Sequence, residues 1–323
     1  MKYVNIQDKQ DRPLPFYLAM EEYLAKNMDD EELWFMWVVS PTVIVGRNQI
    51  LDREVDLAYC RNHGIDVCRR KSGGGCVYAD RNNVMFSYIS RSSNVSTTFT
   101  RYTSGIVTML KGLGLDASAT GRNDILVNGL KVSGSAFYHM PDRSIVHGTM
   151  LYDTDFDNMS HAIRPPVDKL RVHGVQSVPQ RITTLKPLIP HSLNDFMEYA
   201  KRSMSTGEYD LTDNDICNIE QIMAGYLKPD WIEGRKRVPA TLHNRVRIDG
   251  VGTVEVNAVV TDRYISDFQL FGDFFPLADL DWLCRKLTGV AYDREAVESV
   301  LDGTDMGSYI AGLNKETFLN LIF

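Results

Sequence analysis

Cysteine pairs and metal-binding patterns are absent from this sequence. The 323 residues include five cysteines and seven histidines, with no CxxC, HxxxH or HExxH spacing among them. An odd cysteine count does not fit a complete disulfide framework, which favours a reducing compartment, and the missing ligand spacings give no support for a zinc site. We therefore expect a cytoplasmic protein with free cysteines and no zinc.

Long apolar runs and an excess of positive charge are also absent. The longest apolar run, Leu33–Val39, is far shorter than the ~20 residues that span a bilayer. The first fifteen residues carry charges and prolines where a secretion signal has an apolar core. The formal net charge is −7, whereas nucleic-acid binding needs clustered Lys and Arg. We expect no membrane segment and no nucleic-acid partner.

The length predicts two domains, because a typical domain has roughly 100–200 residues. Lys228–Pro239 contains two prolines and a glycine and is typical of a linker. We therefore expect one domain over 1–240 and a smaller one over 241–323. From Arg245 onward, seven basic and thirteen acidic residues give 7 − 13 = −6, so an acidic partner should dock on the N-terminal domain.

Hydrophobic periodicity and turn residues predict a mixture of helices and strands in both domains. In the first domain, we expect a helix over 14–28, a helix that is capped by Ser96 and runs to about residue 113, and further helices within 192–227. We expect strands over 42–45, 65–69, 84–89, 124–127 and 130–137. In the second, we expect strands over 245–260 and 265–271 and helices over 276–288, 293–301 and 316–322. Thr212 and Asp215 form a capping pattern before an apolar run. The fold class is α+β.

A glycine-rich loop follows one predicted strand. The segment RRKSGGGCVYAD begins at Arg69 and contains three consecutive glycines, which permit a backbone whose N–H groups form an anion-binding nest. Because an arginine fork holds carboxylates and phosphates, the neighbouring arginines favour an anion site over an ordinary tight turn. No Walker pattern occurs in the chain.

A predicted hairpin carries a second group of polar residues. Asn128-Gly129 is a strong signal for a two-residue turn, and strand alternation would place Lys131, Ser133 and Ser135 on one face. Taken alone, such a lysine is most often a solvated surface charge. The small polar residues around it favour a role in a site.

These segments together resemble the lipoate–protein ligase A family. The resemblance rests on FYLAMEE, WFMWVVSPTVIVGRNQ, RRKSGGGCVYAD, GRNDILVNGLKVSGSAF, HGTML and KLRVHGVQSVPQRITTL, in that order, and covers roughly residues 14–190. It implies a catalytic domain of mixed sheets and helices shared with biotin ligases, followed by an accessory C-terminal domain. It also implies an ATP-dependent enzyme that converts lipoate to lipoyl-AMP, releases pyrophosphate and lipoylates a lysine of a carrier domain.

The resemblance implies roles for individual residues. Lys131 is the expected catalytic lysine, which contacts the acyl carbonyl and the α-phosphate. The residues expected to bind lipoate or lipoyl-AMP are Glu21, Trp37, Arg70, Ser72, Gly73, Gly74, Gly75, Val77, Ser135, Ala136, His147 and Thr149. Those expected to bind ATP are Arg70, Gly75, Tyr78, Asn123, Asp124, Ile125 and Lys131, with Asp124 also a contact for Mg²⁺.

The expected cofactors are ATP, as a substrate, and Mg²⁺. The expected partners are lipoate and the apo lipoyl domains of 2-oxoacid dehydrogenase E2 subunits and of the glycine cleavage H protein. Because these domains are commonly acidic, we expect them to dock near Arg69–Lys71.

Two other functions of the same fold remain open. An octanoyl or lipoyl transferase would use a cysteine thioester and no ATP, but Ser133–Thr149, where the transferases carry their cysteine, contains none. Cys76 lies beside the glycines without a histidine spaced to act as its base, so we interpret it as a packing residue. A degenerate ligase that only binds lipoate or lipoyl domains is suggested by Ala79, where the family often has histidine. A biotin ligase is disfavoured because its GRGRxxxW-like loop is absent.

Overall fold

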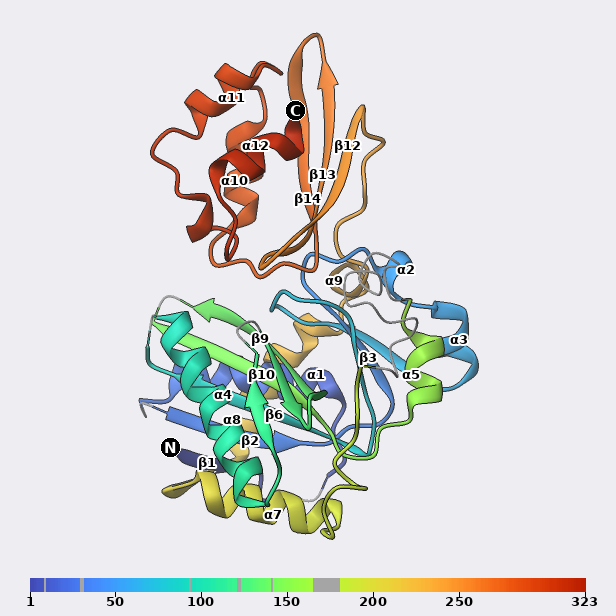
Figure 1. Cartoon of the computed structure of the whole chain (residues 1–323), viewed down its shortest axis with the longest axis vertical. Coiled ribbons are helices and arrows are strands. Elements are labelled where there is room, and N and C mark those ends of the chain that lie inside the picture. The colour runs from blue at the N-terminus through green and yellow to red at the C-terminus, as the bar shows by residue number, and fades with distance from the viewer. Residues whose placement is uncertain (9, 30–31, 93, 121–122, 141, 165–180) are drawn as a thin grey trace.

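The largest element is an eight-stranded mixed sheet (Figure 1). The computed structural model describes the chain except residues 9, 30–31, 93, 121–122, 141 and 165–180. The strands are β1 (Lys2–Asn5), β2 (Glu32–Trp37), β6 (Asn83–Ser90), β7 (Ala117–Ala119), β8 (Asp124–Val127), β9 (Leu130–Met140), β10 (Arg143–Leu151) and β11 (Gly207–Asp210). Their spatial order is β11-β1-β2-β6-β10-β9-β8-β7, and β11 pairs with β1 in parallel.

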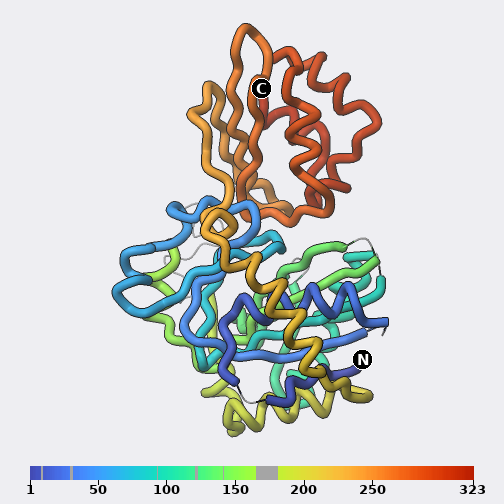
Figure 2. Tube along the Cα trace, turned by 180° about the vertical axis from the view of Figure 1, so that it is seen from behind, coloured from blue at the N-terminus to red at the C-terminus, as the bar shows by residue number. Residues whose placement is uncertain are grey.

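Two helices cover each face of this sheet. Helices α1 (Leu14–Asn27) and α8 (Asp213–Tyr226) lie side by side on one face, as Figure 2 shows. Helices α4 (Val95–Gly112) and α7 (Leu193–Met204) cover the other face. Alternation along β2 divides the core accordingly, since Trp34 packs with α4 and α7 while Phe35 packs with α1 and α8. The face covered by α1 also holds the polar groups described below.

A three-stranded sheet lies beside the large one, in the order β4-β3-β5. Its elements are β3 (Thr42–Val45), β4 (Asp66–Arg69) and β5 (Val77–Ala79), with the short helices α2 (Leu51–Glu54), α3 (Leu57–Asn62) and α5 (Phe156–Ala162). The turn from β4 to β5 is the glycine-rich segment. This sheet therefore holds both ends of the predicted loop.

The C-terminal part has its own sheet and core. Strands β12 (Leu242–Ile248), β13 (Gly252–Thr261) and β14 (Tyr264–Gly272) form an antiparallel sheet. Helices α10 (Leu280–Leu287), α11 (Arg294–Val300) and α12 (Lys315–Ile322) and the 3-10 turn η2 (Met306–Ser308) pack on it. The predicted strand over 245–260 is two strands, because a turn at Asp249-Gly250 reverses the chain. The domain division at residue 240 stays a prediction.

Three further expectations can be compared with the structure. The Thr212–Asp215 capping box is confirmed, with both reciprocal hydrogen bonds formed. The cap predicted at Ser96 was wrong, because Asn94 caps α4 by accepting from the N–H of Thr97. The predicted linker contains a short helix, α9 (Pro229–Glu233). Strand β11 was not predicted, and it interrupts the range 192–227 that was expected to be helical. No helix in the described residues is long and apolar enough to cross a membrane.

Backbone contacts join the C-terminal part to the glycine-rich loop. The N–H of Gly74 donates to the carbonyl of Phe274 at 3.1 Å, and the N–H of Gly272 donates to the carbonyl of Asn48 at 2.9 Å. The Phe275 ring stacks on Phe137, with ring centroids 5.0 Å apart. A Cβ atom on Gly73 would lie 2.3 Å from the Phe274 carbonyl oxygen, so only glycine permits this approach.

Arg69 fixes α9 against the start of the loop. Its side chain is 1% exposed, and its guanidinium donates to backbone carbonyls of Gly46 and Gln49 on one side and of Trp231, Ile232 and Glu233 on the other. Burial lowers the pKa of Arg69 to about 10, so it remains charged at neutral pH. Its positive charge is therefore satisfied by carbonyl dipoles inside the protein.

We expect Arg69→Met to lower the free energy of unfolding by about 3 kcal/mol, because several buried carbonyls lose their donor. Guanidinium chloride denaturation followed by tryptophan fluorescence measures this change. Arg81→Met is the matched control, since Arg81 is 58% exposed in a surface pair with Asp11 and should change stability by under about 1 kcal/mol. Equal effects of the two substitutions would contradict the structural role of Arg69.

Candidate active site

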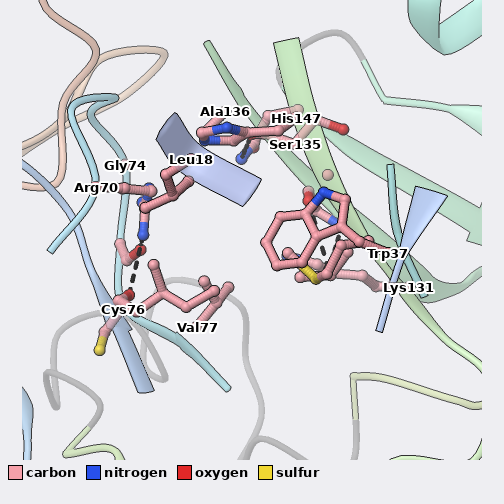
Figure 3. Close-up of a pocket in the computed structure, with 17 residues that line it drawn as sticks. Leu18, Trp37, Arg70, Gly74, Cys76, Val77, Lys131, Ser135, Ala136 and His147 are labelled. Carbon is pink, nitrogen blue, oxygen red and sulfur yellow. Dashed lines mark hydrogen bonds between the residues drawn. The ribbon is translucent and has the colours of Figure 1, made fainter. Parts of the chain in front are cut away.

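A pocket of about 90 Å³ opens between the glycine-rich loop and strands β2, β6, β9 and β10 (Figure 3). Apolar side chains, among them Leu18, Trp37 and Val77, form part of its wall. The ammonium-bearing side chain of Lys131 and the imidazole of His147 line it as well. The pocket therefore combines an apolar surface with a cation, which suits a ligand that has an apolar chain and a negative group.

The glycines allow the loop to pack backbone against backbone. Gly74 has a φ of +85°, a conformation that side-chained residues rarely adopt. A Cβ atom on Gly46 would lie 2.2 Å from the Gly74 carbonyl oxygen, so the loop from β3 and the glycine-rich loop are in direct backbone contact. The Gly74 N–H already donates to Phe274. This N–H becomes available to an anion only when that contact breaks.

Arg70 shapes the loop from inside. Its guanidinium is 4% exposed and donates to the carbonyls of Ile44, Gly73 and Gly75 at 3.0, 2.7 and 2.7 Å and to the Ser72 hydroxyl at 2.9 Å. Burial lowers the pKa of Arg70 to about 10. The expectation that these arginine forks grip an anion therefore needs correction, because Arg69 and Arg70 bind carbonyls of the protein itself.

A buried hydrogen-bond chain runs from Arg70 to Glu21. The Ser72 hydroxyl lies 2.7 Å from His147 Nε2, and His147 Nδ1 lies 3.0 Å from the Glu21 carboxylate, which is 0% exposed. Because a carboxylate only accepts, Nδ1–H faces Glu21, and in neutral His147 the Nε2 atom accepts the Ser72 proton. Each group in this hydrogen-bond chain therefore donates toward Glu21, from the positive Arg70 at one end to the negative Glu21 at the other. The His147 ring that faces the pocket is fixed by these bonds.

Trp37 is held by the same carboxylate. Its indole N–H donates to the Ser87 hydroxyl at 2.9 Å, and Ser87 donates to Glu21 at 2.6 Å. The Trp37 ring also stacks on Tyr17, with centroids 5.0 Å apart. Glu21 therefore orients two pocket walls at once, His147 and Trp37.

Lys131 lies just after the turn of the predicted hairpin. Asn128 and Gly129 have φ angles of +51° and +78°, which confirms the expected two-residue turn. The register then shifts, because Ile125 pairs with Ser133 while Leu126 pairs with Lys131, leaving Val132 as a bulge. The prediction that simple alternation puts Lys131 and Ser133 on one face was therefore wrong.

Asp124 holds the ammonium of Lys131 at 2.7 Å and the guanidinium of Arg181 at 2.5 Å. A carboxylate with two cationic partners is poorly suited to bind a metal ion as well. Within the described ranges, no group of three or more His, Cys, Asp or Glu side chains could hold a metal. The residues present therefore do not form a protein cage for Mg²⁺.

The structure gathers most of the predicted site residues around this pocket. Those that line it are Trp37, Arg70, Gly74, Gly75, Val77, Asn123, Lys131, Ser135, Ala136, His147 and Thr149. Glu21, Ser72 and Asp124 lie behind it and contact His147 or Lys131. The anion grip expected of Arg70 needs the correction given above, and the other binding roles assigned to these residues stay predictions.

Three further predicted residues do not line the pocket. Gly73 packs against Phe274, while the rings and methyls of Tyr78 and Ile125 lie in two different apolar clusters. Only backbone atoms of Tyr78 and Ile125 could reach a nucleotide. Most of the expected segment Lys169–Leu185 lies outside the described residues, as do Gly121 and Arg122.

Sequence reasoning missed six lining residues: Leu18, Ile44, Cys76, Met85, Gly134 and Gly148. Pairing explains three of them, since Met85 lies opposite Trp37, Gly134 opposite Thr149 and Gly148 opposite Ser135. The order of strands in the sheet was needed to find these neighbours. Ala79 is fully buried in the core beside α1, so no polar group replaces the histidine that the family often has there.

Two family models match this chain. The lipoyl protein ligase A/B catalytic domain matches residues 13–205, and the bacterial lipoate protein ligase C-terminus matches residues 238–322. Lipoate-protein ligase LplJ of Bacillus subtilis is 33% identical over 318 residues, covering 95% of this chain and 96% of that protein.

Two solved structures share the fold. LipL1 of P. falciparum in complex with lipoate is 20% identical, with a TM-score of 0.78, and covers 99% of this chain and 97% of that one. A bi-partite lipoate protein ligase from the lipoylation system of Thermoplasma acidophilum is 25% identical, with a TM-score of 0.64, and covers 73% of this chain and 98% of that one.

Proposed function

Because the chain belongs to the lipoyl protein ligase A/B family, we propose that its pocket activates lipoate with ATP and transfers the lipoyl group to a lysine of a carrier domain. The observation that carries this proposal is the position of Lys131, which lines a pocket whose wall includes the apolar side chains of Leu18, Trp37 and Val77. An apolar wall accommodates the acyl chain, and the ammonium meets the carboxylate and phosphate. We also propose a cytoplasmic location, which the five free cysteines support.

The first step forms the acyl-adenylate. An oxygen of the lipoate carboxylate attacks the α-phosphorus of ATP, the bond from that phosphorus to the bridging oxygen breaks, and pyrophosphate leaves. Negative charge gathers on the phosphoryl oxygens, and Lys131 stabilises it as a preorganised cation. To do so, its ammonium exchanges part of its contact with Asp124 for the phosphate. Mg²⁺ would arrive with ATP on phosphate oxygens and water, as it commonly does.

The second step forms the amide. The amine of the carrier lysine attacks the lipoyl carbonyl, the C–O bond to AMP breaks, and the nitrogen loses a proton. Lys131 polarises the same carbonyl in this step. His147, held by Glu21 and Ser72, fixes one wall so that the acyl group stays aligned.

The pocket must widen to accept these ligands. Its volume of about 90 Å³ is smaller than the ~150 Å³ cavity that holds benzene, and an acyl-adenylate is much larger than benzene. The glycine-rich loop is the wall whose contacts are mostly backbone to backbone. We infer that this loop moves when substrate enters.

The proposed partners are apo lipoyl domains of 2-oxoacid dehydrogenase E2 subunits and the glycine cleavage H protein. Support comes from the archaeal lipoylation system of Thermoplasma acidophilum, which includes a bi-partite lipoate protein ligase and its E2 lipoyl domain. A second candidate, an acyl transferase without ATP, would need a thioester cysteine. Cys76 is the one described cysteine that lines the pocket, so it is the cysteine whose substitution tests this candidate.

We expect carrier modification to require ATP and lipoate and to release one pyrophosphate per lipoyl group. The protein is mixed with ATP, Mg²⁺, lipoate and an apo lipoyl domain, and the carrier mass and pyrophosphate are measured together. Omitting ATP while supplying an octanoylated acyl-carrier protein is the control for the transferase. Modification under that control condition would overturn the ligase assignment, and binding without any modification would favour an inert binder.

We expect Lys131→Ala to reduce lipoyl-AMP formation by about 10²–10³-fold, with a much smaller effect on lipoate affinity, because the cation is most needed when phosphoryl and carbonyl oxygens gain charge. Pyrophosphate release, lipoate affinity and thermal unfolding are measured in parallel. Lys186→Ala is the matched control, since Lys186 forms an exposed pair with Asp153. Near-normal pyrophosphate release by the Lys131 variant would remove Lys131 from the chemistry.

We expect Cys76→Ser to keep most of the ligase activity, because the Cys76 side chain only fills space in the pocket wall. The initial rate of carrier modification should change less than about threefold, as is usual for a near-isosteric change. Cys217→Ser, at an exposed position on α8, is the control. A loss near a thousandfold, with an acyl-thioester trapped on the wild-type protein, would instead support the transferase.

A further inference from the structure

A single buried carboxylate is surrounded by four basic side chains where the two parts of the chain meet. Glu255, on β13, has a side chain that is 2% exposed. Arg53 from α2 contacts one of its oxygens, Arg237 lies 2.8 Å and His243 3.1 Å from the other, and Arg245 lies 3.7 Å away. These four residues are called the basic cluster below. The guanidinium groups of Arg53 and Arg237 both contact this one carboxylate, so positive charge exceeds negative charge at this contact.

The cluster reaches the surface although its carboxylate does not. The side chains of Arg53 and Arg237 are each 34% exposed and that of His243 is 45% exposed. A guanidinium has five N–H donors in a planar fork, and each of these two arginines spends one nitrogen on Glu255. Donors therefore remain directed at solvent, where they can meet carboxylates of another molecule.

The cluster is connected to the wall of the active-site pocket. Glu255 pairs with Phe271 across the β13–β14 hairpin, and three residues later Phe274 bonds to Gly74 of the glycine-rich loop. On the other side, Gly46 packs on Gly74, and Arg53 follows seven residues after Gly46. Figure 1 shows α2 and β12 at this junction.

The cluster differs in sign from the rest of the molecule. The chain has a net charge of −7, and residues from Arg245 onward carry −6. A general negative field repels an acidic partner, so a local positive patch beside the pocket selects the orientation in which such a partner can approach. In Arg69–Lys71, the docking segment expected from sequence, Arg69 and Arg70 are buried and only Lys71, which pairs with Glu22, is partly exposed, so this segment offers solvent one cation where the basic cluster offers several.

We propose that the basic cluster binds acidic residues beside the acceptor lysine of the carrier domain and so directs that lysine to the pocket. This inference rests on the proposed ligase function and adds the docking surface to it. The partner is an acidic protein surface and not a free phosphate, because the partly exposed Arg53, Arg237 and His243 come from separate segments of the chain and together offer several cations to one surface. Neither Arg53 nor Arg237 takes part in the chemistry of the pocket.

The test compares Arg237→Gln with Arg294→Gln, which removes an equally charged arginine from α11, where it pairs with Glu316. An apo lipoyl domain with carboxylates next to its acceptor lysine is the substrate, and KM and kcat for that carrier are measured at low and high salt. We expect Arg237→Gln to raise KM about fivefold at low salt and Arg53→Gln/Arg237→Gln about twentyfold, with kcat within twofold and a weaker salt dependence. Arg294→Gln should leave KM unchanged.

Carrier-free lipoyl-AMP formation and thermal unfolding separate docking from other effects. Both should stay near wild-type values in Arg237→Gln. An unchanged carrier KM in an active enzyme overturns the docking surface and leaves the ligase function standing, whereas a wild-type protein that modifies no carrier with ATP defeats the function itself. If Arg237→Gln lost stability or adenylate formation to an extent that accounts for the KM change, the docking role would be overturned, and the cluster would only hold the two domains together. Competitive inhibition by pyrophosphate that disappears in Arg237→Gln would assign the cluster to a small anion instead.

Discussion

The buried guanidinium of Arg70 holds the glycine-rich loop in its shape, and the pocket exists because of that shape. Isolated charges are not stable inside proteins, so Arg70 needs both carbonyl acceptors and an opposite charge. The loop carbonyls supply the acceptors, and Glu21 supplies the opposite charge through Ser72 and His147. The contacts that stabilise this one buried cation therefore also fix the loop and the His147 ring that form walls of the pocket. This links the polar residues of a helix, a loop and a strand that are far apart in sequence.

This arrangement explains why binding and chemistry can be assigned to different groups. Glu21 holds His147 directly and Trp37 through Ser87, so it can orient these two walls without changing when the glycine-rich loop moves. Lys131 is different, because its ammonium lies 2.7 Å from the buried carboxylate of Asp124, which also contacts Arg181. A charge held in this way can turn toward a phosphate. The static part of the site and the part that responds to substrate are thus built from different kinds of contact.

Local sequence predicted the features that depend on backbone geometry alone. The Asn128-Gly129 turn, the strand Thr42–Val45 and the Thr212 capping box are set by neighbouring residues, and the structure has all three. The bulge at Val132 was not predictable, because it depends on how β8 and β9 pair. It changes the face on which Lys131 lies relative to Ser133.

The two arginines were misread for a physical reason. A glycine-rich backbone exposes N–H groups, which attract anions, and carbonyls, which attract guanidinium groups. The sequence shows that arginine and glycine are adjacent but not which of these backbone groups they meet. Trp231 and Ile44, which lie far from the loop in sequence, supply further carbonyls that complete the two arginine sites. Only the folded chain brings those acceptors together.

The contacts that join the C-terminal part to the glycine-rich loop form within a single polypeptide, so one gene encodes both sides of this junction. The loop meets Phe274 through a backbone hydrogen bond, and the Phe275 ring stacks on Phe137. The covalent connection through residues 234–241 supplies an effective concentration of order millimolar for these contacts, so they persist inside one polypeptide. A gene split at this point would lose that effective concentration, and the two products would have to meet in solution before the pocket wall is complete.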